Sequence, residues 1–222
     1  MKNLIIIGAG GHAAEIVDYI EYINFNSMNP KYTIVGLLDN TESYYNHYGF
    51  NYKFLGNTDT HLIDKEIYYV IGIGNVSVRK KVIDEYVSKG AKFKSIIHPT
   101  ALISKTATIG EGSLISHNVS IGPKANIGKF CVINSRSTIG HDSEFGENNF
   151  LSPQVVIGGF SKIGNSNLFG TNSSVIPDTK IGDNNKIMAG MTVVNKVKDN
   201  EVVFYRFKEK LIVRNNNQNN SI

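Results

Sequence analysis

Apolar and polar residues follow two different patterns along this chain of 222 residues. Up to about residue 97, short apolar runs alternate with segments whose apolar residues have helical spacing. From residue 103 to residue 193, a large apolar residue recurs at every sixth position. This change predicts two domains, residues 1–97 and 98–195, each with a core of its own.

The first domain is predicted to be a small, Rossmann-like α/β domain. Strands are expected at residues 2–8, 33–39 and 67–75, and helices at residues 9–23 and 76–90. Asn75 or Ser77 is placed to begin the second helix, and Gly90 to end it. Because strands alternate with helices, we expect a parallel sheet.

The second domain is predicted to be a left-handed parallel β-helix. Sixteen large apolar residues keep the six-residue spacing: Ile103, Ile109, Ile115, Ile121, Ile127, Ile133, Ile139, Phe145, Leu151, Ile157, Ile163, Phe169, Val175, Ile181, Ile187 and Val193. Six residues form one flat face and one corner, and three faces close a coil of about 18 residues. The repeat therefore predicts about five coils. A small residue usually stands two places before each apolar residue, and a glycine often follows it. We expect glycine or asparagine at the corner to tolerate backbone conformations that a β-branched residue cannot adopt.

Two segments follow the repeat. Residues 196–214 leave the six-residue spacing and are expected to cap the β-helix. Residues 215–222 are polar and of low complexity, and they are expected to be disordered.

Composition narrows the functional classes. The chain has 41% hydrophobic and 19% charged residues, as soluble globular proteins do, and no apolar stretch approaches the roughly 18 residues of a membrane span. The net charge is +4 without a basic run, so no nucleic-acid partner is predicted. The single cysteine, Cys131, excludes an intrachain disulfide and is expected to be buried. We expect a cytoplasmic protein that does not insert into membranes.

A β-helix does not by itself specify a function. An acyltransferase, a metalloenzyme and a structural or binding module all use this architecture. The β-helix enzymes that hold zinc use three histidines, two of them close in sequence. In this chain His98, His117 and His141 are spaced 19 and 24 residues apart, so no metal site is predicted.

His141 is the candidate general base. It stands at a predicted corner with its side chain outward, and Asp142 could orient the imidazole. A neutral imidazole can take the proton that an ammonium must lose before it attacks a thioester. With about 18 residues per coil, Gly159 stacks on His141, where its N–H could meet a developing oxyanion. A solvated histidine and a tight glycine corner with a positive φ are the alternatives, and His117 is interpreted as a surface residue.

A glycine-rich turn joins the first predicted strand and helix. Gly8, Gly10 and Gly11 place backbone N–H groups at a helix N-terminus, which favours an anion. Ala13 stands where the full dinucleotide fingerprint has its third glycine. Asp39, at the end of the second strand, is placed to accept a hydrogen bond from a ribose or a base. Because the domain is too small for two mononucleotide halves, a nucleotide sugar fits better than NAD.

Five segments carry a family resemblance: GAGGHA, LLDN, IGIGN with Arg79, IHPTA, and the hexapeptides with GHD. Together they resemble the bacterial sugar O- and N-acetyltransferases of the sialic-acid acetyltransferase type, over residues 2–195. The group includes enzymes that N-acetylate UDP- or GDP-linked 4-amino sugars. The resemblance implies acetyl-CoA as acyl donor, a nucleotide-linked amino sugar as acceptor, and a homotrimer with its sites between subunits.

The resemblance also implies residue roles. His141 with Asp142 is the general base, and the Gly159 amide binds the thioester oxygen of acetyl-CoA. Asn134 lies in the site. The remaining roles fall on the first domain, where Gly10, Gly11 and His12 hold the phosphates of the nucleotide sugar and Asp39 contacts its nucleotide.

The chain departs from the family pattern in two places. Phe150 stands where a second histidine is common, and residues 202–211 lack the Gly-x-Pro-Ala-Lys motif that closes over CoA. The aromatic residues 44–54 are interpreted as a loop that either packs ordinarily or stacks on a base. We therefore predict N-acetylation of a nucleotide-linked amino sugar in surface-glycan biosynthesis. The alternatives are O-acetylation of sialic acid or a related sugar acid and, more remotely, a non-catalytic binding or structural β-helix.

Overall fold

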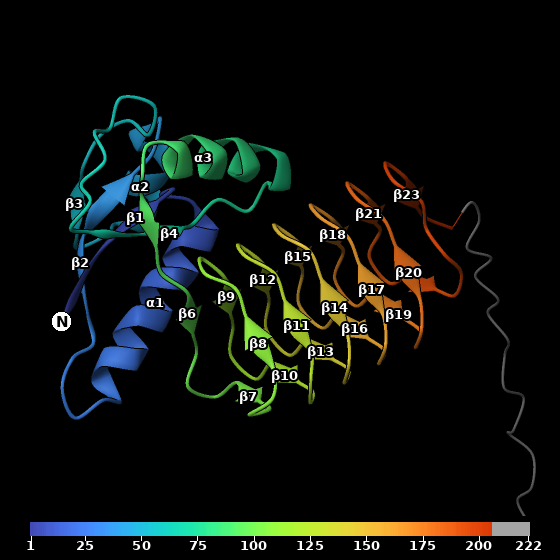
Figure 1. The fold of residues 1–222 in the computed structure, drawn as a ribbon. Helices are drawn as coiled ribbons and strands as arrows, with labels where there is room; N and C mark the ends of the chain where they lie inside the picture. The colour runs from blue at the N-terminus through green and yellow to red at the C-terminus, as the bar shows by residue number, and fades with distance from the viewer. Residues whose placement is uncertain (206–222) are drawn as a thin grey trace, which may run out of the picture.

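A five-stranded parallel sheet forms the centre of the N-terminal domain (Figure 1). The computed structural model describes residues 1–205. In the sheet the strands are ordered β3 (Lys53–Phe54), β2 (Tyr32–Leu38), β1 (Lys2–Ile7), β4 (Tyr68–Ile71) and β5 (Lys92–Phe93). The helices are α1 (Gly11–Phe25), α2 (Glu42–Tyr48) and α3 (Val76–Ser88). No helix within residues 1–205 is long and apolar enough to cross a membrane.

The expected α/β elements are present. All neighbouring strands of the sheet run parallel, as predicted. Asn75 begins α3 by accepting from the backbone N–H groups of Ser77 and Val78, and Gly90 follows its end with φ +84°. The prediction of a loop at residues 44–54 was wrong, because α2 and β3 lie there. None of the seven residues of α2 is buried, so this helix has no periodic apolar face by which to recognise it.

Three flat faces make up the β-helix (Figure 1). Face 1 consists of β6 (Ile96–Ile97), β9 (Leu114–Ile115), β12 (Val132–Ile133), β15 (Phe150–Leu151), β18 (Leu168–Phe169), β21 (Lys186–Ile187) and β23 (Val202–Val203). Face 2 consists of β7 (Leu102–Ile103), β10 (Ser120–Ile121), β13 (Thr138–Ile139), β16 (Val156–Ile157), β19 (Ser174–Val175) and β22 (Thr192–Val193). Face 3 consists of β8 (Thr108–Ile109), β11 (Asn126–Ile127), β14 (Glu144–Phe145), β17 (Lys162–Ile163) and β20 (Lys180–Ile181).

The left-handed β-helix is confirmed, and it is longer than predicted. Each repeated apolar residue is the second residue of a strand, and together these residues form the core of the prism. The prism starts at Ile96, because β6 already pairs with β9, two residues before the expected boundary. Val202 and Val203 pair with β21, so the start of the expected cap continues face 1. The result is six coils instead of five; residues 206–222, which include the rest of the cap and the tail, lie outside the described residues.

The small interior residues are buried as expected. Cys131 is completely buried, and burial raises the pKa of its thiol to about 11, so it is an inert packing residue. In the next coils along the same interior column stand Asn149, Asn167 and Asn185. Each of these side-chain oxygens accepts from the backbone N–H of the coil that follows, at 2.7–2.9 Å. These bonds satisfy polar groups that the prism would otherwise bury unpaired.

The glycines that follow the apolar residues serve close stacking, so the prediction of special corner conformations was wrong for them, whereas asparagines do hold such conformations. A Cβ on Gly128 would lie 2.3 Å from the Gly146 oxygen, and one on Gly140 would lie 2.4 Å from the Gly159 nitrogen. The left-handed conformation falls two residues later, at every sixth residue from Asn118 to Asn184, with φ between 55° and 62°. Most of these residues are polar, and Gly112 (φ +69°) and Gly190 (φ +68°) continue the series at its two ends.

One buried guanidinium joins the two domains. Arg79 of α3 is only 1% exposed, and it donates to Asn148 Oδ1 (3.0 Å) and to the backbone oxygen of Phe130 (2.6 Å). Burial lowers the pKa of Arg79 to about 10, which leaves it charged at neutral pH. Beneath α1, Leu114 and Val132 point outward from face 1 and join the core of the α/β domain. The α/β domain is therefore fixed on face 1.

We expect Arg79→Ala to destabilise the protein by about 3 kcal/mol or more, because it leaves buried acceptors without donors. Thermal unfolding at one fixed protein concentration measures this change. Lys162→Ala is the matched control: it removes an exposed cation that pairs with Glu144, and such surface pairs contribute at most about 1 kcal/mol. An equal effect of the two substitutions would contradict the role of Arg79.

Candidate active site

His141 stands at the corner between face 2 and face 3. Its imidazole Nδ1 lies 2.9 Å from Asp142 Oδ2, and its side chain is 56% exposed. Asp142 has a left-handed backbone with φ +56°, and its N–H donates to the backbone oxygen of Pro123 in the coil below. The carboxylate is thus held by the coil, and its bond to Nδ1 directs Nε2 away from Asp142.

Gly159 lies directly against the His141 ring, in the next coil. A Cβ on Gly159 would be 3.0 Å from both Cε1 and Nε2 of the imidazole. Gly159 has no left-handed φ, so its lack of a side chain makes room for the histidine. Its carbonyl accepts from Asp178, whereas its N–H has no acceptor within residues 1–205. The site therefore combines a possible base with a free amide donor beside it.

Phe160 is a neighbour of His141 that the sequence analysis did not identify. The two rings are 5.0 Å apart between centroids and perpendicular, at 90°. Phe160 occupies one of the left-handed positions, with φ +60°. The sequence did carry a signal, because an aromatic residue stands here in a slot that polar residues fill at most other coils.

The glycine-rich turn lies on the other side of the prism, at the start of α1. His12 packs against Phe150 of face 1, with 5.5 Å between ring centroids, and its Nδ1 lies 3.4 Å from Glu15 Oε2. The His12 side chain is only 10% exposed, and its buried Nε2 has no partner within residues 1–205. A buried ring nitrogen without a partner is a group that a ligand can satisfy.

Asp39 holds the same turn in place. Its two carboxylate oxygens accept from the backbone N–H groups of Ala9 (2.7 Å) and Thr41 (3.2 Å). Around it, Gly10 has open space on its Cα, whereas a Cβ on Gly11 would meet the Tyr48 hydroxyl at 2.8 Å. Asp39 therefore stabilises the turn, and its carboxylate oxygens still have lone pairs that can accept hydrogen bonds from a ligand.

Asn134 does not lie beside His141 of the same chain. It stands at the corner between face 1 and face 2, is 8% exposed, and its Oδ1 accepts from the N–H of Ser135. Face 2 separates this corner from that of His141, because β13 connects the two.

His117 is partly exposed, and it has neighbours that the sequence analysis did not identify. His117 is half-buried and forms a cluster of rings with His98, Tyr19 and Tyr22 at the seam between α1 and the first coils. Burial lowers the pKa of His98, and the neighbouring His117 lowers it further. Within residues 1–205 no group of three or more His, Cys, Asp or Glu side chains is arranged to hold a metal ion.

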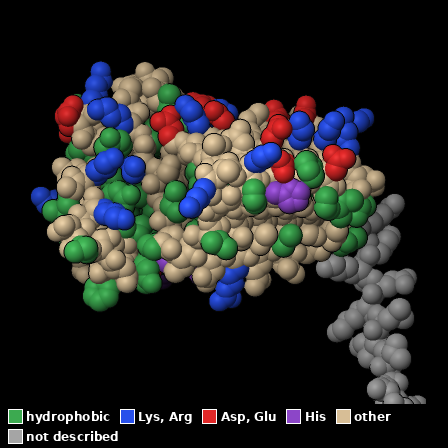
Figure 2. All heavy atoms as spheres, turned by 60° about the horizontal axis from the view of Figure 1, so that its bottom comes forward, with side chains coloured by type: hydrophobic (Ala, Val, Ile, Leu, Met, Phe, Trp, Pro, Cys, Tyr) green, Lys and Arg blue, Asp and Glu red, His purple; other side chains and the backbone are tan. Residues whose placement is uncertain are grey.

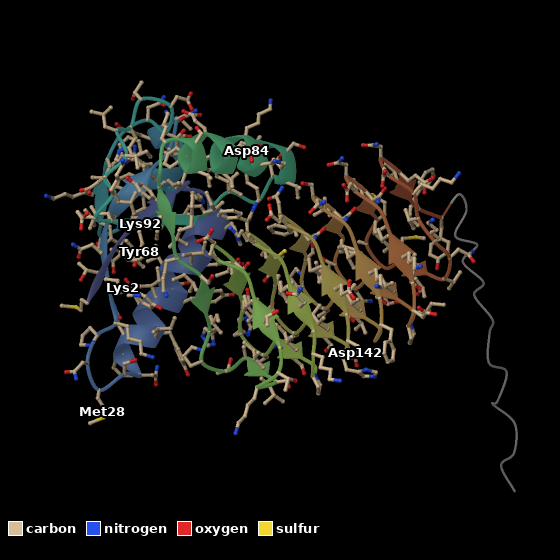
Figure 3. The ribbon with its side chains drawn as sticks, viewed as in Figure 1. Lys2, Met28, Tyr68, Asp84, Lys92 and Asp142 are labelled. Atoms are coloured by element: carbon tan, nitrogen blue, oxygen red, sulfur yellow. The ribbon has the colours of Figure 1, made fainter. Side chains whose placement is uncertain are left out.

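The predicted site residues thus form two groups on opposite sides of one chain. Gly10, Gly11 and His12 belong to the α/β domain on face 1, whereas His141 stands at the prism edge opposite face 1. Figure 3 labels Asp142, the neighbour of His141, along the lower edge of the β-helix. A single chain therefore does not bring the two groups together.

Comparison with known proteins agrees with both domains. Residues 3–86 match the family model described as the PglD N-terminal domain. The UDP-N-acetylbacillosamine N-acetyltransferase of Bacillus subtilis (strain 168) is 32% identical over 119 residues, which cover 52% of this chain and 51% of that protein. The aligned part thus spans about half the length of that curated relative.

Solved structures share the fold over nearly the whole chain. PerB from Caulobacter crescentus, in complex with CoA and GDP-perosamine, superposes with a TM-score of 0.78 at 23% identity, covering 91% of this chain and 93% of that one. The acetyltransferase domain of PglB from Neisseria gonorrhoeae, in complex with acetyl coenzyme A, superposes with a TM-score of 0.77 at 21% identity, covering 90% and 95%. Residues 3–86 therefore match the PglD N-terminal domain family, and the chain as a whole shares the fold of these solved structures.

Proposed function

We propose that this protein transfers an acetyl group from acetyl-CoA to the amino group of a nucleotide-linked amino sugar, in the cytoplasm and for surface-glycan biosynthesis. The arrangement at one corner carries this proposal: His141 pairs with Asp142, and its ring lies against the free amide of Gly159. The Bacillus subtilis relative, named for N-acetylation of a UDP-linked amino sugar, supports an amine as the acceptor.

His141 acts as the base of the reaction. Nε2 takes a proton from the acceptor ammonium, and the free amine attacks the thioester carbonyl carbon. The oxygen of the resulting tetrahedral intermediate gains negative charge, which the Gly159 N–H stabilises. When the C–S bond breaks, the imidazolium returns its proton to the CoA thiolate. The nitrogen loses a second proton to water, so that the amide, the free thiol and one solvated proton are the products. Asp142 stabilises the imidazolium between these two transfers.

The active site lies between two copies in a homotrimer. The outward residues of face 2 carry no charge: Leu102, Ser120, Thr138, Val156, Ser174 and Thr192. Hydrophobic side chains on this side, including Val156, Phe160 and Ile176, are 40–53% exposed in one chain, and Figure 2 shows isolated hydrophobic side chains over the coils. A face without charged residues is suited to contact with another copy, because the core of a protein interface is depleted of charge.

The two edges of face 2 explain how a trimer completes the site. One edge carries His141, and the other carries Asn134 beside the α/β domain. In a closed ring of three copies, one edge of each chain meets the opposite edge of the next. His141 of one copy thereby comes to face Asn134 and the glycine-rich turn of its neighbour. The turn holds the phosphates of the nucleotide sugar at the N-terminus of α1.

The first test replaces the base. We expect His141→Ala to lower kcat by about 10² to 10⁴, the usual loss for a general base, with little change in either KM. Steady-state kinetics with acetyl-CoA and a nucleotide-linked amino sugar measure this. Asp142→Asn is the graded comparison and should cost less, because it removes orientation and charge but keeps the base. A His141→Ala enzyme with nearly unchanged kcat would show that another group accepts the proton.

The second test separates the two substrates. We expect Gly10→Leu to raise the KM for the nucleotide sugar about tenfold or more while sparing the KM for acetyl-CoA, because the side chain fills the space of a phosphate. The fold tolerates this change, since nothing lies within 4 Å of the added Cβ and Gly10 has an ordinary φ of −84°. Equal rises of both KM values would argue against a nucleotide site at the turn.

A further inference from the structure

Phe160 combines a left-handed backbone with an exposed side chain. Its backbone is left-handed at φ +60°, which is a genuine outlier for a bulky residue. Its side chain is 53% exposed and belongs to none of the hydrophobic clusters of residues 1–205. The ring contact that the described part of the chain gives it is the perpendicular contact with His141.

Phe130 is a second phenylalanine with a left-handed backbone in this repeat, and it allows a comparison of burial. It has nearly the same φ, +57°, but its side chain is only 5% exposed and packs edge-on against Phe93 under the α/β domain. Burial compensates for the backbone cost at Phe130. Within one chain Phe160 has no such burial, and its ring contact in residues 1–205 is with the candidate base His141.

We propose that Phe160 is a positioning residue for the His141 imidazole. This inference rests on the proposed role of His141 as the base. Asp142 holds the ring at Nδ1, but one hydrogen bond leaves the ring free to turn about that contact. The perpendicular phenyl ring of the next coil blocks this rotation and keeps Nε2 against Gly159, where the thioester oxygen is to be held.

Few other side chains near His141 could orient its imidazole. In the same corner column, Lys124 lies one coil below Asp142 and Asp178 lies one coil above Phe160. Neither side chain has a hydrogen bond or ion pair to His141 in residues 1–205. The orientation of the imidazole therefore depends on Asp142 at one nitrogen and on Phe160 at the ring.

A double-mutant cycle tests the proposal. We expect Phe160→Leu to lower kcat about 10-fold with both KM values unchanged, as a misplaced base does. Phe160→Tyr keeps the ring and should retain most of kcat. In a His141→Ala background, Phe160→Leu should change kcat by less than about twofold, because a residue that acts through His141 has nothing left to position.

Two further variants separate positioning from structure. Phe160→Asn suits the left-handed backbone but removes a ring from the proposed trimer contact, so it should keep the trimer and shift Tm by no more than about 5 °C while lowering kcat as Phe160→Leu does. Phe130→Leu, the matched control at another corner, should lower Tm and leave kcat within about twofold.

Three results would each overturn the proposal. The first is that the losses of kcat from Phe160→Leu and His141→Ala multiply in the double mutant, and the second is that Phe160→Leu changes only KM. The third is that Phe160→Asn loses the oligomer and has a lower Tm. If His141→Ala is impaired and Phe160→Leu is not, only the role of Phe160 fails. If His141→Ala is fully active, both roles fail.

Discussion

The stacking of coils with a period of 18 residues is the constraint on which this protein depends. It requires a residue without a side chain wherever two backbones touch, as at Gly128 and Gly140, and it pairs each apolar strand residue with its equivalent one coil away. The same period places Gly159 against His141. The geometry of the candidate base is thus a consequence of how the prism closes, without a dedicated loop.

The contact between the two domains determines where the glycine-rich turn lies relative to His141. The buried Arg79 and the apolar residues beneath α1 fix the α/β domain on face 1. Because His141 stands at the edge opposite face 1, the rigid attachment keeps the glycine-rich turn away from the base of its own chain. In the proposed trimer, the uncharged face 2 between the two edges is the surface through which a neighbouring copy would complete the site.

The sequence predicted the features that follow from its repeating patterns, but few of those that depend on packing between elements. The six-residue spacing identified the prism and the stacking of Gly159 on His141, and the alternation of strands and helices identified the parallel sheet. It did not reveal that the repeat glycines serve close contact, because composition does not distinguish a steric need from a positive φ. Spacing alone carries no information on contacts between residues that are distant in the chain. Examples are the ring contacts of Phe160 and His117 and the hydrogen bonds of Arg79.

The most direct measurement of the shared site uses mixed trimers. His141→Ala and Gly10→Leu chains, each impaired alone at low nucleotide-sugar concentration, are co-expressed with different tags, and mixed trimers are confirmed by sedimentation. Every mixed ring contains one interface that joins an intact His141 to an intact turn, so randomly mixed chains should recover about one quarter of wild-type activity. Activity no higher than that of the two impaired parents, in trimers shown to be mixed, would mean that each chain uses its own turn and its own His141.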